Sequence, residues 1–416
     1  MLEHLFTSPA VLRRHREAPW ATERARYLAH RAEQGCAHPT LLRLASALLV
    51  VARELDASPG LAVPPEQIAA AAERWAQRQR RRGRARSPRW SRGRFVQVAT
   101  QWLRFLGRLH EPVAAPTPWS AAVEAFAGWM QRERGLSHCT IRNRRWHLGQ
   151  FLGWYASQGR PLAAVAATDL DAFLTALGRR GWSRVSLATS AKALRAFFRH
   201  AERRGGCAPG LAAAIATPRV FAQETCPRGP AWEEVQRLLA RTQTDRPRDL
   251  RDRALLLLFA VYGLRASEAA GLRLDHLDWE HEVLWVPRAK AQGHPQPYPL
   301  VPTVGEAILA YLQRVRPRSA RREVFLTLKA PFRPLSPGAL YHVTSSRLAQ
   351  LGCPTPHRGP HALRHACALR LVAAGCSLKV IGDHLGHRSS SATRLYAKVD
   401  LAGLREVAAL ELGGLT

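Results

Sequence analysis

The sequence predicts a mainly α-helical protein with one small β-sheet, an α+β fold spread over several domains. Most of the 416 residues lie in segments whose apolar residues recur every three to four positions, as in amphipathic helices. Only EVLWVP and YPLVP have a strand-like pattern, and RAKAQGHPQP between them indicates a hairpin. Two Pro-containing linkers, residues 111–118 and 215–230, divide the chain. We therefore expect domains over residues 1–112, 113–219 and 226–416.

The first block, residues 1–112, is expected to be helical and basic. ATERARYLAHRAEQ and PTLLRLASALLVVARELD both have the helical apolar spacing. Residues 74–94 then carry ten arginines and no acidic residue, which predicts an exposed loop or a phosphate-binding arm. Arg80, Arg81 and Arg82 are the predicted DNA contacts there. Trp75 and Trp90 are expected to anchor helices more often than to stack on bases.

The second block, residues 113–219, is also predicted to be helical. Its segments begin near Ser or Thr and end at Gly, which are helix start and stop signals. Two of the helices carry basic faces, which are either solvated or in contact with a DNA backbone. The predicted DNA contacts are Arg142, Arg144, Arg145, Lys192 and Arg195.

The charge balance indicates a polyanionic partner. The chain has 62 Lys and Arg residues against 31 Asp and Glu residues, a formal net charge of +31. A GC-rich genome explains why only five of the 62 are lysines, but it does not explain the excess of base over acid. Such an excess is typical of proteins that bind nucleic acid.

The remaining composition excludes several classes of protein. No run of 18 apolar residues and no secretory signal are present, so we expect no membrane partner and a cytoplasmic, nucleoid-associated location. None of the seven cysteines forms a CxxC pair, which argues against a zinc ribbon or a disulfide framework.

The third block, residues 226–416, contains the residue types of a catalytic site. RDRALLLLFAVYG is apolar on all sides and is expected to be a buried helix, followed by Arg265 and, three residues later on the same helix face, Glu268. A guanidinium near the core needs an anion, and Glu268 is the expected supporting partner. Lys290 lies on the predicted hairpin, where an ammonium can release a proton and a guanidinium cannot.

Two further clusters follow in the sequence. HALRHACALRLV places His361, Arg364 and His365 on one helix face. Two histidines four residues apart suggest zinc, but Ala362 stands where a zinc protease carries Glu and no third ligand has suitable spacing, so no metal is expected. In HLGHRSSSATRLYAKV, His387 follows a glycine that ends one helix, and Tyr396 lies within or at the end of the next.

Together these clusters resemble the tyrosine recombinase, or phage integrase, family. The family pattern is Arg, Lys, His-x-x-Arg, His and Tyr in that order. The sequence supplies it, over about residues 226–411, as Arg265, Lys290, His361, Arg364, His387 and Tyr396. The second block resembles the helical core-binding domain of the family, whereas the first block lies outside the common pattern.

The resemblance implies a site-specific recombinase or integrase, of a mobile genetic element, acting on double-stranded DNA as a dimer or tetramer. Arg265 and Arg364 would neutralise the scissile phosphate, with His361 and His387 as further donors. Tyr396 would attack to form a 3′-phosphotyrosyl link, and Lys290 would protonate the leaving 5′ oxygen. No cofactor, metal or ATP is implied.

Some features depart from the pattern or leave alternatives open. The hairpin sequence RAKAQGH lacks the usual GKG, so Arg288 competes with Lys290 for the acid role. A C-terminal helix over LAGLREVAALEL would pack either on its own chain or on a neighbouring subunit. The alternative functions are a non-catalytic DNA-binding protein, with a helix-turn-helix around residues 377–397, and a type IB-like topoisomerase.

Overall fold

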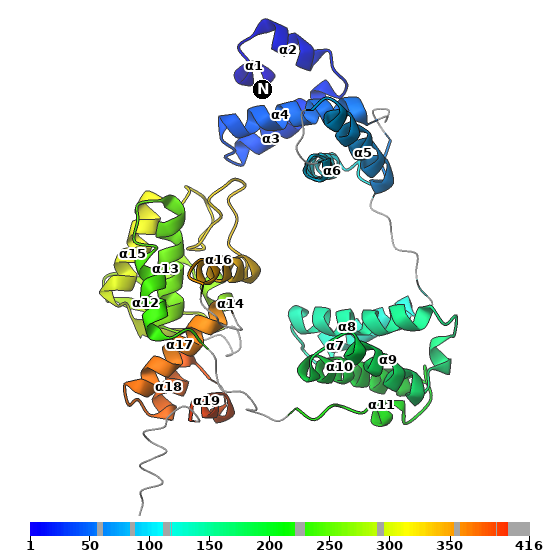
Figure 1. Ribbon diagram of the computed structural model, residues 1–416, viewed down its shortest axis with the longest axis vertical. Helices are drawn as coiled ribbons and strands as arrows, with labels where there is room; N and C mark the ends of the chain where they lie inside the picture. The colour runs from blue at the N-terminus through cyan, green and yellow to red at the C-terminus, as the bar shows by residue number, and fades with distance from the viewer. Residues whose placement is uncertain are drawn as a thin grey trace, which may run out of the picture. The chain divides into compact units, whose positions relative to one another are not determined.

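The computed structural model describes residues 1–55, 61–83, 88–110, 117, 119–220, 229–288, 295–352, 358–387 and 389–397. These residues are mostly helical, as Figure 1 shows, and they include one small sheet, as predicted. They divide into two compact units, one of residues 112–225 and the other of residues 1–111 and 226–416. The three predicted domain boundaries stay a prediction.

The described part of the N-terminal block contains the helices α1 (Leu2–Leu5), α2 (Pro9–Arg16), α3 (Ala21–Glu33), α4 (His38–Glu54), α5 (Pro65–Arg81) and α6 (Pro88–Phe105). They share a hydrophobic cluster that includes Leu28, Leu48 and Trp102, all fully buried. The Arg-rich run is not a loop along its described length, because α5 and α6 contain most of it. The expectation for the tryptophans was right for Trp75, which packs against the cluster, and wrong for Trp90, which is 68% exposed.

Residues 112–225 form a helical unit around their own aromatic core. Its elements are α7 (Ser120–Arg132), α8 (His138–Ala156), the 3-10 helix η1 (Leu162–Ala164), α9 (Ala167–Arg179), α10 (Arg184–Glu202) and α11 (Leu211–Ala214). Ser137 and Ser183 cap α8 and α10, since each side chain accepts a backbone N–H three residues ahead. Phe126, Phe151 and Phe197 are fully buried where α7, α8 and α10 meet.

The C-terminal block combines helices with the sheet. Its helices are α12 (Trp232–Ala240), α13 (Pro247–Val261), α14 (Ala266–Ala270), the 3-10 helix η2 (Leu274–His276), α15 (Pro302–Arg314), α16 (Pro337–Gln350), α17 (Pro360–Ala373), α18 (Leu378–Leu385) and α19 (Ser390–Ala397). Strands β1 (Leu277–Asp278), β2 (Val283–Val286) and β3 (Gln296–Pro299) form an antiparallel sheet in that order. Val286 pairs with Gln296, so β2 and β3 form a hairpin where one is predicted, but β3 begins two residues before YPLVP and ends at Pro299, and Pro302 already belongs to α15.

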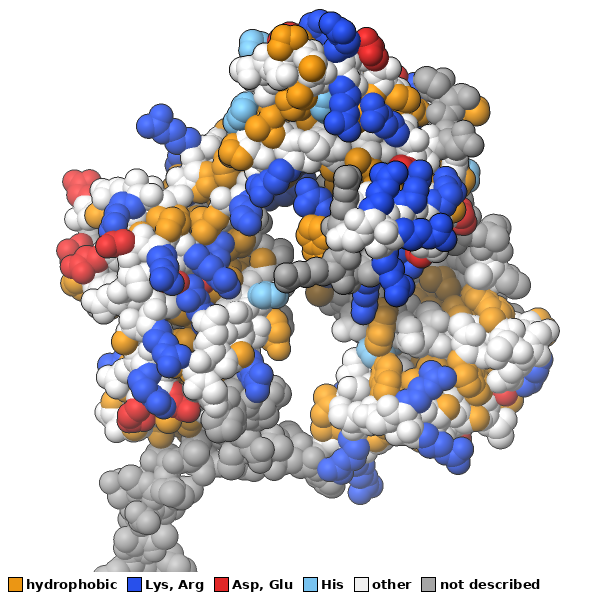
Figure 2. Space-filling view, turned by 45° about the horizontal axis from the view of Figure 1, so that its top comes forward, with side chains coloured by type: hydrophobic (Ala, Val, Ile, Leu, Met, Phe, Trp, Pro, Cys, Tyr) orange, Lys and Arg blue, Asp and Glu red, His pale blue; other side chains and the backbone are white. Residues whose placement is uncertain are grey.

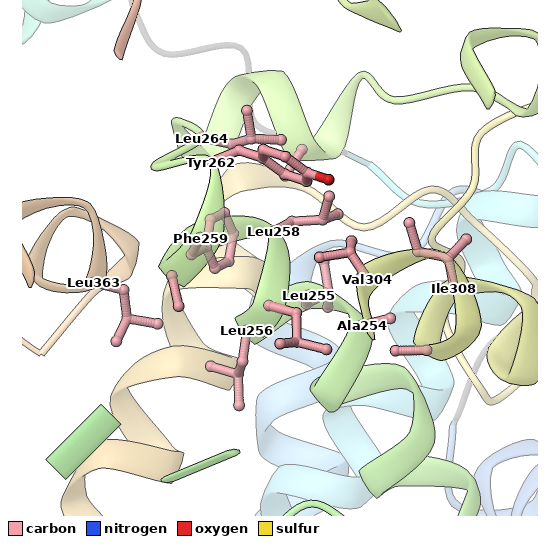
Figure 3. Packing of buried hydrophobic residues seen from close by; sticks show 14 of the residues in the cluster. Ala254, Leu255, Leu256, Leu258, Phe259, Tyr262, Leu264, Val304, Ile308 and Leu363 are labelled. Carbon is pink, nitrogen blue, oxygen red and sulfur yellow. The ribbon is translucent and has the colours of Figure 1, made fainter. Parts of the chain in front are cut away.

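Helix α13 is the buried helix that the sequence predicts. Its leucines contact α15 on one side, at Val304 and Ile308, and α17 on the other, at Leu363 (Figure 3). Burying one such side chain stabilises a fold by about 1.5–3 kcal/mol. The end of α13 is thereby fixed in place, and the first site arginine follows four residues later.

Among the charged side chains on the face seen in Figure 2, Lys and Arg are spread widely and Asp and Glu are few. Within the described residues, no helix is both long and apolar enough to cross a membrane.

Candidate active site

A tight turn after α13 places Arg265 at the start of α14. Gly263 makes this turn with φ of 60°, and a Cβ there would lie 2.5 Å from a methyl carbon of Leu385. Arg265 is therefore the N-cap residue of α14 and does not share a helix face with Glu268, contrary to expectation. Instead the Glu268 carboxylate receives the Arg265 backbone N–H at 2.8 Å and its Nη1 at 2.7 Å. The predicted pairing forms, but through a helix cap.

Glu268 holds a second guanidinium as well. Its side chain is 1% exposed and lies 2.9 Å from Nη1 of Arg288, which is itself 6% exposed. Burial alone would raise the pKa of Glu268, but the Arg265 backbone N–H and the Arg288 charge outweigh burial and lower it. The carboxylate thus stays charged between Arg288 and Arg265, whose side chain keeps 32% of its surface exposed.

Helix α17 supplies a buried arginine beneath the site. Arg364 is 2% exposed, and its two terminal nitrogens donate to the carbonyl oxygens of Gly263 and Leu385. Burial, helped by the Arg265 charge, lowers the pKa of Arg364 to about 10. The guanidinium therefore stays protonated at neutral pH and links α13, α17 and α18.

Four consecutive carbonyl groups at the end of α18 each accept a side-chain hydrogen bond. Gln296 donates to Asp383 O at 2.9 Å, Tyr298 donates to His384 O, Arg364 donates to Leu385 O at 2.7 Å, and Arg265 donates to Gly386 O at 3.2 Å. The last carbonyls of a helix have no partner within it and carry partial negative charge, so they favour cationic donors. We call this set of contacts the α18 clamp. It connects the hairpin and both site arginines to the loop that bears His387.

His387 follows the clamp directly. Gly386 ends α18 in the left-handed conformation, and the His387 N–H then bonds to Gly382 O at 2.9 Å. The ring Nδ1 lies 2.7 Å from the hydroxyl of Thr393 on α19. Burial first, and the Arg364 and Arg265 charges next, lower the pKa of His387 to about 4, so the ring is neutral at pH 7.

Tyr396 on α19 reaches the same place with its hydroxyl buried. The side chain is 2% exposed, and its ring is parallel to that of His387 with centroids 6.5 Å apart. Its hydroxyl lies 2.9 Å from Nδ1 of His365. Burial raises the pKa of Tyr396 to about 12, although the Arg364 charge opposes that rise. Loss of the phenol proton therefore needs help from the site.

His365 was missed as a partner of the tyrosine. The sequence placed it on one helix face with His361 and Arg364, and the structure agrees, since the two histidine rings are 4.4 Å apart. That shared face, on a helix already assigned to the site, was the available signal. On spacing alone, however, the two histidines suggest zinc and not a partner for the tyrosine.

An open cavity adjoins these groups. Its volume is about 480 Å³, and Arg265, Arg358, His361 and His365 contribute to its lining together with the ring of Tyr341. Cationic and imidazole groups around a pocket of this size suit a phosphate group.

Comparison with known proteins identifies the family. The model of the phage integrase family matches residues 231–402, and that of its N-terminal SAM-like domain matches residues 123–205. The putative integrase/recombinase y4rA of Sinorhizobium fredii is 36% identical over 296 residues, which are 70% of this chain and 71% of that protein. The chain belongs to the phage integrase family. It is a site-specific DNA recombinase of the tyrosine type.

Further relatives agree with this assignment. Tyrosine recombinase XerC of Rhodospirillum centenum is 36% identical to the recombinase over 298 residues, 69% of this chain and 85% of that protein. Among solved structures, the XerH site-specific recombinase bound to palindromic difH substrate has a TM-score of 0.54 at 15% identity, covering 85% of this chain and 98% of that one. The latter likeness concerns the fold alone.

The structure thus brings five of the six predicted catalytic residues of the recombinase together. Lys290 lies outside the described residues. Its competitor Arg288 is held by Glu268, by Gln296 Oε1 at 2.9 Å and by the Tyr298 hydroxyl, which is a structural arrangement. The catalytic roles themselves stay predictions.

The predicted DNA contacts of the recombinase lie in varied surroundings. Arg80 to Arg82 are exposed at the end of α5, and Arg142 and Lys192 are exposed on α8 and α10. The other three have protein partners: Arg144 with Met130 Sδ, Arg145 with Glu124, and Arg195 with Ile215 O and Thr217. Arg195 therefore also has a structural role at the end of its unit.

Proposed function

We propose that the recombinase cuts one strand of double-stranded DNA by direct attack of Tyr396 on a phosphodiester. The oxygen of Tyr396 forms a bond to phosphorus, and the bond to the 5′ oxygen of the next nucleotide breaks. The products are a 3′-phosphotyrosyl link and a free 5′ hydroxyl. One observation carries this proposal: the Tyr396 hydroxyl is hydrogen-bonded to His365, and His365 lines the cavity that also contains cationic side chains.

Charge neutralisation is the main contribution of the two arginines. A phosphodiester is anionic and gains charge on its non-bridging oxygens during attack, so fixed guanidinium donors lower the barrier. Arg265 is the exposed donor at the cavity, and Glu268 holds it in place. Arg364 adds positive charge from below, while His361 and neutral His387 act as hydrogen-bond donors.

The leaving 5′ oxygen needs a proton, which we assign to Lys290. Glu268 of α14 holds Arg288 in an ion pair, and a guanidinium does not release its proton, so the lysine is the better acid of the two. The covalent link retains the energy of the broken bond, and the 5′ hydroxyl of a second strand then displaces Tyr396. No metal ion or ATP enters this scheme.

The proposed reaction also indicates the DNA partner and the oligomeric state of the recombinase. Exchange between two duplexes needs one active tyrosine for each strand cut, so we propose a dimer or tetramer on double-stranded DNA. The XerH relative was solved bound to its difH substrate. Integration or excision of a mobile element is the proposed role. A monomeric topoisomerase is the alternative, and a measurement of the oligomeric state on DNA would distinguish the two.

A nicked suicide duplex tests the nucleophile. We would cut such duplexes from the DNA that flanks the gene of this chain and separate the products on denaturing gels. The wild-type chain should form a covalent adduct, whereas Tyr396→Phe should bind the duplex equally well and form none. The matched control is Tyr341→Phe, which changes a hydroxyl at the same cavity and should keep the adduct. Adduct formation by Tyr396→Phe would refute the assignment.

A further inference from the structure

The hydrogen bond between Tyr396 and His365 joins the proposed nucleophile to a residue without an assigned role. Both side chains are buried, at 2% and 8% exposure, and the oxygen to Nδ1 distance is 2.9 Å. Such a buried contact excludes water from the hydroxyl, so the neighbouring imidazole is the group in place to receive its proton. His365 also lines the cavity.

The other histidine near Tyr396 is less well placed. Nδ1 of His387 is 2.7 Å from the Thr393 hydroxyl, and its ring lies parallel to the phenol ring. Among the described residues, the hydrogen bond of the Tyr396 hydroxyl is to His365, and that of the His387 ring is to Thr393. Other charged or titratable groups face the Tyr396–His365 pair from α17, from the start of α14 and across the cavity: His361, Arg364, Cys367, Arg265 and Arg358.

We propose that His365 is a catalytic residue that accepts the phenol proton of Tyr396. This inference rests on the proposed role of Tyr396 as nucleophile. As the Tyr396 oxygen bonds to phosphorus, its proton moves to Nδ1 of His365, which begins neutral with its proton on Nε2 and becomes an imidazolium. During rejoining, the departing Tyr396 oxygen takes the same proton back. While the covalent phosphotyrosyl link exists, the positive imidazolium lies beside the anionic phosphate.

His365→Asn separates proton transfer from positioning. The asparagine amide can occupy the place of Nδ1 and keep a hydrogen bond to the hydroxyl, but it cannot accept a proton. We expect the rate of adduct formation to fall about 100- to 10,000-fold in His365→Asn, as in His365→Ala. The rate of the asparagine variant should continue to rise with pH toward the pKa of the tyrosine. His281→Asn, at an exposed histidine paired with Asp278, is the control.

Further outcomes decide between the roles. Replacing Tyr396 with 3,5-difluorotyrosine, a more acidic phenol, should recover much of the rate lost in His365→Asn. A near wild-type rate in His365→Asn together with a slow His365→Ala would mean that His365 only positions the hydroxyl, which overturns the proposal. If Tyr396→Phe still forms adducts, the nucleophile assignment itself fails, and that result is distinct from either outcome.

A second and independent observation concerns the N-terminal block. Helix α6 buries Phe95, Ala99 and Trp102 in the core and turns the opposite face to solvent. That exposed face carries Trp90, Arg94, Gln97 and Gln101 at helical spacing, and α6 contains no acidic residue.

A groove of about 720 Å³ runs along this face between α4 and α6. Arg31 and Arg43 line it from α3 and α4, and Arg89 and Arg94 line it from α6. Within the described part of the chain, none of the four forms an ion pair with a carboxylate. Like charges on facing walls repel each other unless an anion lies between them. The exposed Trp90 ring, with the Arg94 guanidinium 5.6 Å above it, adds apolar surface at one end.

We infer that this groove holds one sugar–phosphate strand of a DNA duplex, with the α6 face in the adjacent major groove. Arginines on both walls would contact phosphates, and the apolar lining would contact sugars. Gln97 and Gln101 would then meet base edges, since an amide side chain can bond in pairs to adenine. This contact surface lies outside the residues that the family models match and is separate from Arg80 to Arg82.

The salt dependence of DNA binding tests the groove. The full chain would be titrated onto a random-sequence 40-base-pair duplex by fluorescence anisotropy at several salt concentrations. Losing two phosphate contacts in Arg43→Ala/Arg94→Ala should reduce the slope of log K against log salt by about 1.8. Arg16→Ala/Arg92→Ala is the matched control, because both arginines lie in the same block and face carboxylates of Glu3 and Glu73.

The two variants make the outcomes distinct. Equal slopes in the groove variant and in the control would overturn the proposal and would indicate another partner, such as an acidic protein, for the groove. Gln97→Ala/Gln101→Ala should leave the slope unchanged and weaken selection among duplex sequences. Adduct formation on a saturating concentration of the nicked duplex should persist in all these variants, so the result does not depend on the proposed chemistry.

Discussion

Glu268 shows how one buried residue organises the recombinase site. Its carboxylate serves two guanidiniums and one backbone N–H, and only Arg265 among these partners extends toward the cavity. Removing one member of a buried ion pair is costly, because the remaining charge is left without a partner in a medium of low polarity. Arg265, the proposed donor for phosphate, is thus held by a buried carboxylate that does not line the cavity.

Glu268→Gln should destabilise the turn around α14 by about 3 kcal/mol. Native-state hydrogen exchange of the peptide 262–272 would show this as roughly a 100-fold loss of protection at pH 7. The folded-state pKa of Glu268 lies below its unfolded value, so its stabilisation is present above about pH 4.3 and is lost as pH falls through the lower folded pKa. The difference between wild type and variant should therefore shrink toward pH 3. Glu306→Gln, on the exposed face of α15, is the control, and equal protection in both variants would contradict the prediction.

At the scale of elements, the α18 clamp explains how distant motifs act as one site. The hairpin, α14 and α17 each send a donor to successive carbonyls at the end of α18, and His387 follows at once. Because Arg265 donates to the Gly386 carbonyl, a substrate that moved Arg265 would also move Gly386, which directly precedes His387. The hairpin of β2 and β3 is attached to the same carbonyls through Gln296 and Tyr298.

The sequence predicted the elements of this site better than their contacts. Apolar periodicity and Gly or Ser signals are local, so the buried α13, the hairpin and the glycine that ends α18 were all predictable. The bond from His365 to Tyr396 joins residues 31 apart and depends on how α19 packs against α17, which no spacing specifies. Repulsion between its charges predicts an exposed loop or a phosphate-binding arm for the Arg-rich run. Most of its described residues instead lie in helices α5 and α6, which buried apolar residues such as Ala76 and Phe95 hold against the core, and phosphate binding stays a prediction.

At the scale of the whole molecule, the charge is unevenly neutralised. Some arginines face a carboxylate, as Arg16, Arg314 and Arg322 do with Glu3, Asp245 and Asp275. Others, among them Arg80 to Arg82, end a helix on an exposed surface, and no ion pair is recorded for them among the described residues. An arginine releases counterions from DNA when it neutralises a phosphate, and an arginine that already faces a carboxylate does so less fully. The positions of the unpaired arginines therefore matter more for DNA binding than the net charge of +31.

Neutralising Arg80, Arg81 and Arg82 together should weaken binding to the random duplex and reduce the salt slope by about 2.7, if each contacts one phosphate. The matched control is Arg16→Ala/Arg314→Ala/Arg322→Ala, which changes the net charge equally but removes arginines that already face carboxylates. A long-range effect of net charge would lower both slopes alike, whereas direct contact lowers only the first. An unchanged slope in the first variant would mean that the end of α5 is a solvated surface, and the phosphate contacts of the N-terminal block would then belong to the α4–α6 groove alone.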